Sequence, residues 1–96
     1  MLVVFVALGR ADEPELNREQ QARLRLANQV MAEADAHFRK GQYHDAVPLL
    51  LENLRIRREV LGPQHPETLA SMNNVAVIHW QLGADPDMLR LAASLF

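Results

Sequence analysis

The sequence predicts an all-α fold built from antiparallel helix pairs, and three observations lead to it. Long stretches without Gly or Pro carry apolar residues at the spacing of one helix face. Gly and Pro gather instead at short breaks around Gly41, Gly62-Pro63 and Gly83. Finally, the helices that end at Gly41 and Gly83 carry matching residues 42 positions apart (83 − 41). The matched pairs are Ala34 and Ala76, His37 and His79, and Phe38 and Trp80. A fixed internal period of this size is typical of stacked helical repeats.

Composition narrows the classes of protein to which this chain can belong. Its 96 residues suffice for one small domain, and its net charge of −2 provides no strong attraction for nucleic acid or an anionic membrane. The absence of cysteine excludes disulfides, thiolate nucleophiles and cysteine-ligated zinc. Apolar residues make up 49% of the chain and aromatic residues only 5%, a balance that favours helices over a strand-rich sandwich.

The first eight residues, MLVVFVAL, form a continuous apolar run that is too short to span a bilayer as a helix. The run resembles the apolar part of a secretory signal, with small residues at Gly9 and Ala11, although the basic residues that normally precede such a part are missing. Residues 1–11 are therefore either a clipped export signal or an apolar leader without function. The first interpretation places the protein outside the cytoplasm and the second within it, and the sequence does not choose between them.

The first helical stretch is predicted to open at Asp12-Glu13-Pro14 and to run without Gly or Pro from Leu16 to Lys40. Either it is one long helix, or residues 12–26 form a cap helix that breaks near Leu26. Gly41 is expected to end it in a left-handed conformation. The apolar face consists of Leu24, Ala27, Val30, Met31, Ala34 and Phe38.

The second helix is predicted to begin at about Asp45, because Pro48 then falls at the third helical position, where its missing N–H costs nothing. Gly62-Pro63 should end this helix, and His65-Pro66 should begin the next one with Pro at its first position. That third helix, Glu67 to Leu82, is apolar nearly all round, so it is predicted to be buried between neighbours. After Gly83 the pattern weakens to a short helix, Met88 to Phe96.

Several motifs at these positions resemble the tetratricopeptide repeat, in the 42-residue form found in kinesin light chains. Gly41-x-Tyr43-x-x-Ala46 stands at the turn within a repeat, and Leu61-Gly62-Pro63-x-His65-Pro66 stands at the turn between repeats. Asn73-Asn74-Val75-Ala76 matches the family's Asn-Asn-Leu-Ala run. The resemblance implies a helical solenoid, with one repeat at residues 27–62 and a second at 63–96.

The second repeat departs from the family after Gly83. Asp85 stands where the turn Tyr is expected, and Met88 replaces the small residue of the close helix contact. The chain thus holds only about one and a half repeats, whereas about three are usually needed for stability. We therefore expect either a homo-oligomer formed through exposed repeat ends or further repeats beyond this sequence.

The resemblance also implies a peptide-binding groove lined by the first helix of each repeat. An Asn side chain in such a groove can donate to and accept from an extended peptide backbone. For Asn74 the groove is favoured, whereas Asn73 could equally satisfy a carbonyl inside the stack. A ligand held by its terminal carboxylate is not expected, because Met31 and Asp35 stand at the places of a carboxylate clamp. The groove candidates are Asn28, Asp35, Arg39 and Gln42 from the first repeat and Asn73, Asn74, Val77 and Gln81 from the second.

Other chemistries find little support. The basic run Arg55-Ile56-Arg57-Arg58 has Glu52 and Glu59 nearby and no interleaved aromatic residues, so it is interpreted as a solvated outer face rather than a nucleic-acid site. The four His residues are not spaced as metal ligands. No nucleophile motif or Gly-rich phosphate loop is present. We therefore predict no catalytic residues, no metal and no cofactor.

The function predicted from the sequence is a non-enzymatic interaction module that binds a protein or peptide segment, or associates with its own copy through repeat ends. The alternative is an N-terminal fragment of a longer exported or signalling repeat protein that has no activity by itself.

Overall fold

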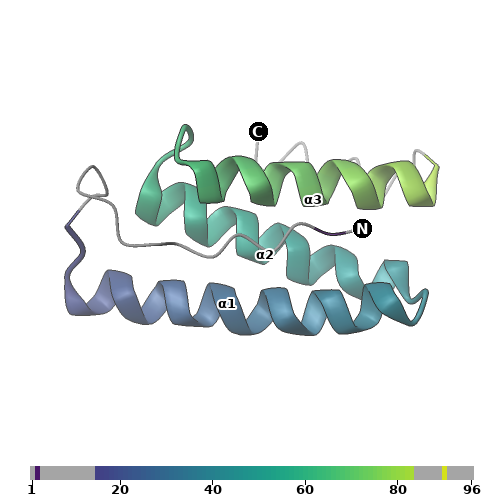
Figure 1. The fold of residues 1–96 in the computed structure, drawn as a ribbon, viewed down its shortest axis with the longest axis horizontal. Coiled ribbons are helices and arrows are strands. Elements are labelled where there is room, and N and C mark those ends of the chain that lie inside the picture. The colour runs from purple at the N-terminus through teal and green to yellow at the C-terminus, as the bar shows by residue number, and fades with distance from the viewer. Residues whose placement is uncertain (1, 3–14, 84–89, 91–96) are drawn as a thin grey trace.

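A computed structural model describes Leu2, residues 15–83 and Arg90 of the chain, and three helices account for most of these residues. They are α1 (Arg18–Arg39), α2 (Tyr43–Leu61) and α3 (Pro66–Leu82). Consecutive helices are antiparallel, so α1 and α3 point the same way, and α2 packs against both of them (Figure 1). The described residues form no strand, and the predicted all-α architecture of antiparallel helix pairs is confirmed.

Helix α1 is one continuous helix that begins later than predicted. Asn17 caps it: its Oδ1 accepts from the Gln20 backbone N–H at 2.8 Å, and the Gln20 Oε1 accepts from the Asn17 N–H at 3.0 Å. This reciprocal pair satisfies two amides that the first turn of a helix leaves without partners. Residues 15–17 are not helical, and Asp12-Glu13-Pro14 lie outside the described residues. The helix continues past Leu26 without a break, so the single-helix alternative holds for residues 18–39.

The turn between α1 and α2 is built on Gly41, whose φ is 75°. The Gly41 N–H donates to the Phe38 carbonyl at 3.0 Å and the Gln42 N–H to the His37 carbonyl at 2.9 Å, which is the Schellman pattern of a helix end. Helix α2 then begins at Tyr43, whose ring centroid lies 5.1 Å from that of Phe38. The prediction of a start at about Asp45 is wrong, because the chain re-enters a helix directly after this turn.

The early start of α2 places Pro48 at the sixth helical position rather than the third. Its missing N–H therefore removes one intrahelical hydrogen bond. The Pro48 ring is exposed on the outer side of the helix, so it does not displace any core side chain.

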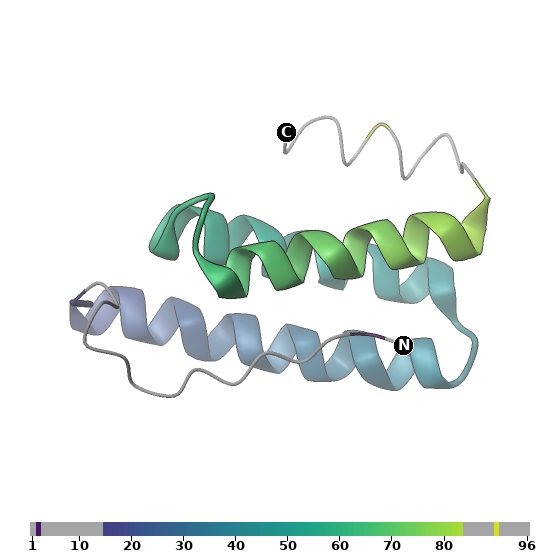
Figure 2. The same ribbon diagram turned by 45° about the horizontal axis from the view of Figure 1, so that its top comes forward.

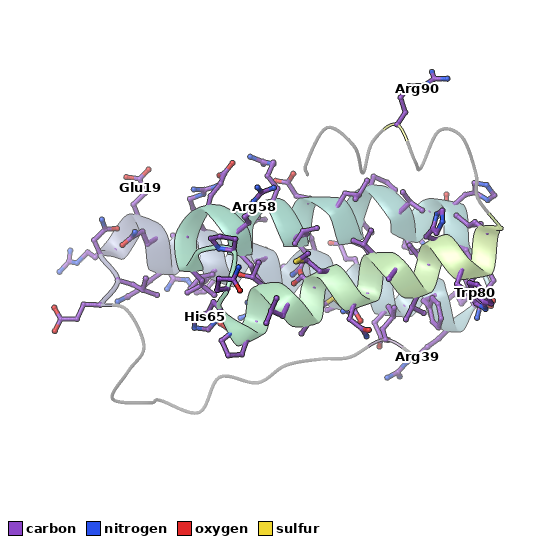
Figure 3. The ribbon with its side chains drawn as sticks, turned by 90° about the horizontal axis from the view of Figure 1, so that it is seen from above. Glu19, Arg39, Arg58, His65, Trp80 and Arg90 are labelled. Atoms are coloured by element: carbon purple, nitrogen blue, oxygen red, sulfur yellow. The ribbon has the colours of Figure 1, made fainter. Side chains whose placement is uncertain are left out.

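The turn between α2 and α3 agrees with the prediction. Gly62 ends α2 with a φ of 94°, and Pro66 is the first residue of α3. His65 caps α3 through its Nδ1, which accepts from the Glu67 N–H at 3.1 Å. Figure 3 shows His65 at this end of α3 and Trp80 near the other end.

The core lies along α2, which contributes buried residues to both neighbours. Ala34 and Ala46 are fully buried where α1 and α2 approach each other closely. The main cluster also contains Leu2, which is 6% exposed although it lies far from α1 in the sequence. Its other members come from all three helices: Met31, Ala34, Ala46, Val47, Leu50, Leu51, Leu54, Val75 and Ile78.

Helix α3 is not buried on all sides as predicted. Its packed side, with Val75 and Ile78, faces the core. The opposite side is exposed: Leu69, Met72 and Trp80 are 47%, 37% and 84% exposed, and Ala76 between them is exposed as well. In the described part of the chain only α2 packs extensively on this helix. The predicted short helix at Met88 to Phe96 lies outside the described residues except for Arg90, which is helical.

Within the part of the chain that the structure describes, no helix is both long and apolar enough to cross a membrane. Among the same residues, no three His, Asp or Glu side chains are grouped in a way that could hold a metal ion.

Candidate functional site: the face shared by α1 and α3

Helices α1 and α3 lie on either side of α2 and form a shared face in front of it (Figures 1 and 2). On α1, Asn28, Met31, Asp35 and Arg39 follow a spacing of 3, 4 and 4 residues, which places them along one side of the helix. On α3, Asn74, Val77 and Gln81 follow a spacing of 3 and 4 residues. A direct contact joins the two sides, because the Asn74 Nδ2 lies 3.7 Å from the Met31 sulfur. These seven residues are called the α1/α3 groove below.

The α1 side of the groove carries both charge and amide groups. Arg39 Nε donates to Asp35 Oδ2 at 2.9 Å, so the predicted i, i+4 ion pair is present. Asn28 is exposed, but its Oδ1 accepts from the Arg57 guanidinium of α2 at 2.7 Å. The Asn28 amide nitrogen is the part of that side chain on which a ligand hydrogen bond could form.

The α3 side is buried at its centre and exposed at its end. Asn74 is only 2% exposed, Val77 is half-buried and Gln81 is exposed. Asn73 lies elsewhere, because its spacing places it with Leu69, Ala76 and Trp80 on the exposed side of α3. The two neighbouring Asn residues therefore belong to different surfaces.

Gln42 sits in the turn between α1 and α2. Its Oε1 lies 2.8 Å from the Nδ1 of His37, so the side chain ties the end of α1 to the start of α2. Among the groove residues the structure shows two direct contacts, Asn74 with Met31 and Asp35 with Arg39. Helical spacing places Asn73 on another side of α3, and Gln42 lies in the turn.

The family model of the tetratricopeptide repeat matches residues 26–87, which is more than half of the chain. This chain belongs to the tetratricopeptide-repeat family. No curated protein and no solved structure matches it. Repeats of this family mediate protein–protein interactions. The 42-residue spacing agrees with the kinesin light chain-like form.

A buried polar cluster behind the groove connects α1, α2 and α3, and no sequence pattern predicted it. Asn53 of α2 is almost fully buried, and its Nδ2 donates to the Ala27 carbonyl of α1 at 2.8 Å. On the other side, the Ser71 hydroxyl of α3 donates to the Asn53 Oδ1 at 2.6 Å. The Asn53 side chain of α2 therefore forms hydrogen bonds with both α1 and α3.

Arg57 makes a second connection across the three helices. Its Nη1 lies 3.4 Å from the Glu67 Oε1 of α3, and its Nη2 donates to Asn28 of α1. Arg57 is 6% and Glu67 is 7% exposed. Burial lowers the pKa of the Arg57 guanidinium, and the Glu67 carboxylate opposes that shift. The interpretation of this basic run as a solvated outer face is wrong for Arg57.

The spacing of the α2 residues contained a signal for this burial. Arg57 follows Leu54 by three residues and precedes Leu61 by four, so it lies on the apolar stripe of α2. Arg55, by contrast, pairs with Glu52 and Glu59 as the sequence indicated. Glu59 also binds Arg23 of α1, so this outer network joins the first two helices.

Proposed function

We propose that this repeat protein is a non-enzymatic interaction module that binds an extended peptide segment in the α1/α3 groove. The observation that carries the proposal is the position of Asn74, between the two first helices and against Met31. An amide there can pair with a peptide backbone whatever its side chains are. The half-buried Val77 beside it offers an apolar contact, and the Asp35–Arg39 pair offers charge at the groove end.

The neighbouring Asn residues supply a matched test of this groove. A peptide-array screen first identifies binding sequences for the intact chain. We expect Asn74→Ala to weaken their binding by about tenfold or more, because one or two backbone hydrogen bonds are lost. Asn73→Ala makes the same chemical change one residue away on another, exposed side of α3, and it should leave binding unchanged. Equal binding by both variants, measured by fluorescence anisotropy on folded protein, would contradict the groove assignment.

A second candidate function is self-association through the exposed side of α3, formed by Leu69, Met72, Ala76 and Trp80. The internal period supports it. The equivalent α1 residues, 42 positions earlier, include Ala27 and Ala34, and both are fully buried. The exposed side of α3 thus matches the side of α1 that receives the second helix of its pair, and a helix of a second copy would fit there. The alternative occupant is a further repeat of a longer exported or signalling protein, of which this chain is the N-terminal part.

Sedimentation velocity over a range of concentrations tests self-association. We expect a dimer that Trp80→Asp abolishes, because a charge would then replace the largest exposed apolar side chain of this surface. Leu26→Asp is the control, since Leu26 is also exposed but lies on α1. A monomer at every concentration would exclude the second copy. Further 42-residue repeats in the coding DNA downstream would support the longer protein.

A further inference from the structure

The most N-terminal described residue is buried in the core. Leu2 is 6% exposed and shares its cluster with Met31 of α1 and with Val75 and Ile78 of α3. Residues near a chain end are usually poorly ordered unless a specific contact holds them. A buried Leu at this place is therefore a contact that needs an explanation.

The other residues of this cluster indicate where Leu2 lies relative to the helices. Met31 belongs to the α1/α3 groove and touches Asn74 across it. Both residues are almost fully buried, whereas Arg39 and Gln81 at the end of the groove are exposed. Leu2 thus shares a buried cluster with Met31, which lies at the buried centre of the groove.

The chain is long enough for this arrangement. Leu2 precedes the cap residue Asn17 by 15 positions (17 − 2), which allows an extended reach of up to about 50 Å. Met31 lies 13 residues beyond the start of α1 (31 − 18), or about 20 Å along the helix. The number of residues between Leu2 and Asn17 is therefore sufficient for Leu2 to reach Met31.

We propose that Leu2 occupies the α1/α3 groove in cis as an apolar anchor. The inference rests on the proposed function, because it names an occupant of the same groove. Residues 2–8 are all apolar, so the matching external partner is an extended segment that presents an aliphatic side chain to the Leu2 position. Such a partner binds only the fraction of molecules from which Leu2 has left, and its apparent affinity falls accordingly.

Methyl NMR on the full chain tests the anchor directly. We expect nuclear Overhauser contacts from the Leu2 methyl groups to a methyl group of Met31, Val75 or Ile78. A mixture of differently labelled chains shows whether these contacts lie within one molecule. The absence of such contacts would overturn the proposal, and so would contacts found only between molecules.

A competition experiment tests the occupancy. The probe is a fluorescent peptide of residues 1–10 carrying a C-terminal lysine tail for solubility. We expect Leu2→Asp to bind this probe at least about tenfold more tightly than the unaltered chain, because the cis occupant no longer competes. Leu26→Asp introduces the same charge on the exposed side of α1 and should bind like the unaltered chain. Equal binding by all three chains, or no binding, would overturn cis occupancy.

The failure of this inference differs from the failure of the proposed function. If Leu2 makes no contact while partner peptides still depend on Asn74, only the cis occupant is wrong. If partner peptides do not depend on Asn74 while Leu2 contacts the cluster, the groove assignment for external partners is wrong.

Discussion

Asn53 is the residue that bonds most directly to both neighbours of the middle helix. Its amide donates to α1 through the Ala27 carbonyl and accepts from α3 through the Ser71 hydroxyl. Buried polar groups are costly when they lose their partners, because they cannot recover hydrogen bonds from water. An apolar residue at position 53 could make neither of these hydrogen bonds.

We expect Asn53→Ala to lower the free energy of unfolding by about 2–4 kcal/mol, since it removes two buried hydrogen bonds and creates a small cavity. Urea denaturation followed by circular dichroism measures the loss. Gln29→Ala, at an exposed position of α1, is the control and should change stability little. A loss no larger than that of the control would mean that the buried amide is not a structural bond.

The ion pairs of Glu59 lead us to expect a stability that depends on pH. The Arg23 guanidinium holds the pKa of the Glu59 carboxyl below its ordinary value, and Arg55 adds to this. Because the folded-state pKa is lowered, the stabilising effect is present above the unfolded pKa of 4.5 and is lost as the pH falls through the folded-state value.

The expected result is that Glu59→Gln has a lower urea midpoint than the unaltered chain at pH 7, and that this difference shrinks below pH 4.5. Glu33→Gln, at an exposed position of α1, should show no such pH-dependent difference. A difference between Glu59→Gln and the unaltered chain that stayed constant with pH would show that the carboxylate charge is not responsible.

Caps and turns determine where each helix begins and ends. The Asn17–Gln20 capping box fixes the start of α1 within the described residues. We expect Asn17→Ala to destabilise the protein by about 1 kcal/mol, because the Gln20 amide loses its acceptor. Thermal unfolding measures this change. Gln20→Ala removes the reciprocal bond and should have a smaller effect; an unchanged melting temperature in both variants would contradict the cap.

The sequence predicted helix ends better than helix starts. Gly41, Gly62 and Gly83 have the positive φ values that end helices, and few other residues adopt that conformation easily. Asn17 was overlooked because Asp12-Glu13-Pro14 offered a stronger start pattern upstream. The predicted start of α2 was too late because Pro48 favoured a start that placed it in the first turn. The Phe38–Tyr43 contact at the observed start depends on tertiary structure.

The candidate site was only partly predictable for a similar reason. Helical spacing places Asn74, Val77 and Gln81 on one side of α3. The separation of Asn73 from Asn74 follows from which side of α3 meets α2, and a single sequence does not specify that. The burial of Arg57 was readable from its place on the α2 stripe, but its charge favoured a solvated interpretation.

The three helices differ in how extensively their neighbours pack against them. Helix α2 is packed on two sides, whereas α3 packs extensively on α2 alone among the described elements. In repeat proteins each unit is stabilised by its neighbours, so a terminal unit opens more readily. The interface of α3 with α2 should therefore be the weaker of the two.

Hydrogen exchange measured by mass spectrometry should show this order. We expect the amides in the middle of α2 to exchange more slowly than those in the second half of α3, at a protein concentration where the chain is monomeric. Raising the concentration should slow exchange in α3 selectively if copies associate through its exposed side. Equal protection of both helices in the monomer would contradict the expected order.

The Arg57 connection also bears on how wide the groove can become. Arg57 binds Asn28 and Glu67, and Glu67 belongs to the first turn of α3. These two contacts of Arg57 hold α1 and α3 at a fixed spacing near one end of the groove. The other end, at Arg39 and Gln81, is exposed on both helices. A ligand with a bulky side chain is therefore expected to fit by moving α1 and α3 apart at Arg39 and Gln81, while the Arg57 contacts stay in place.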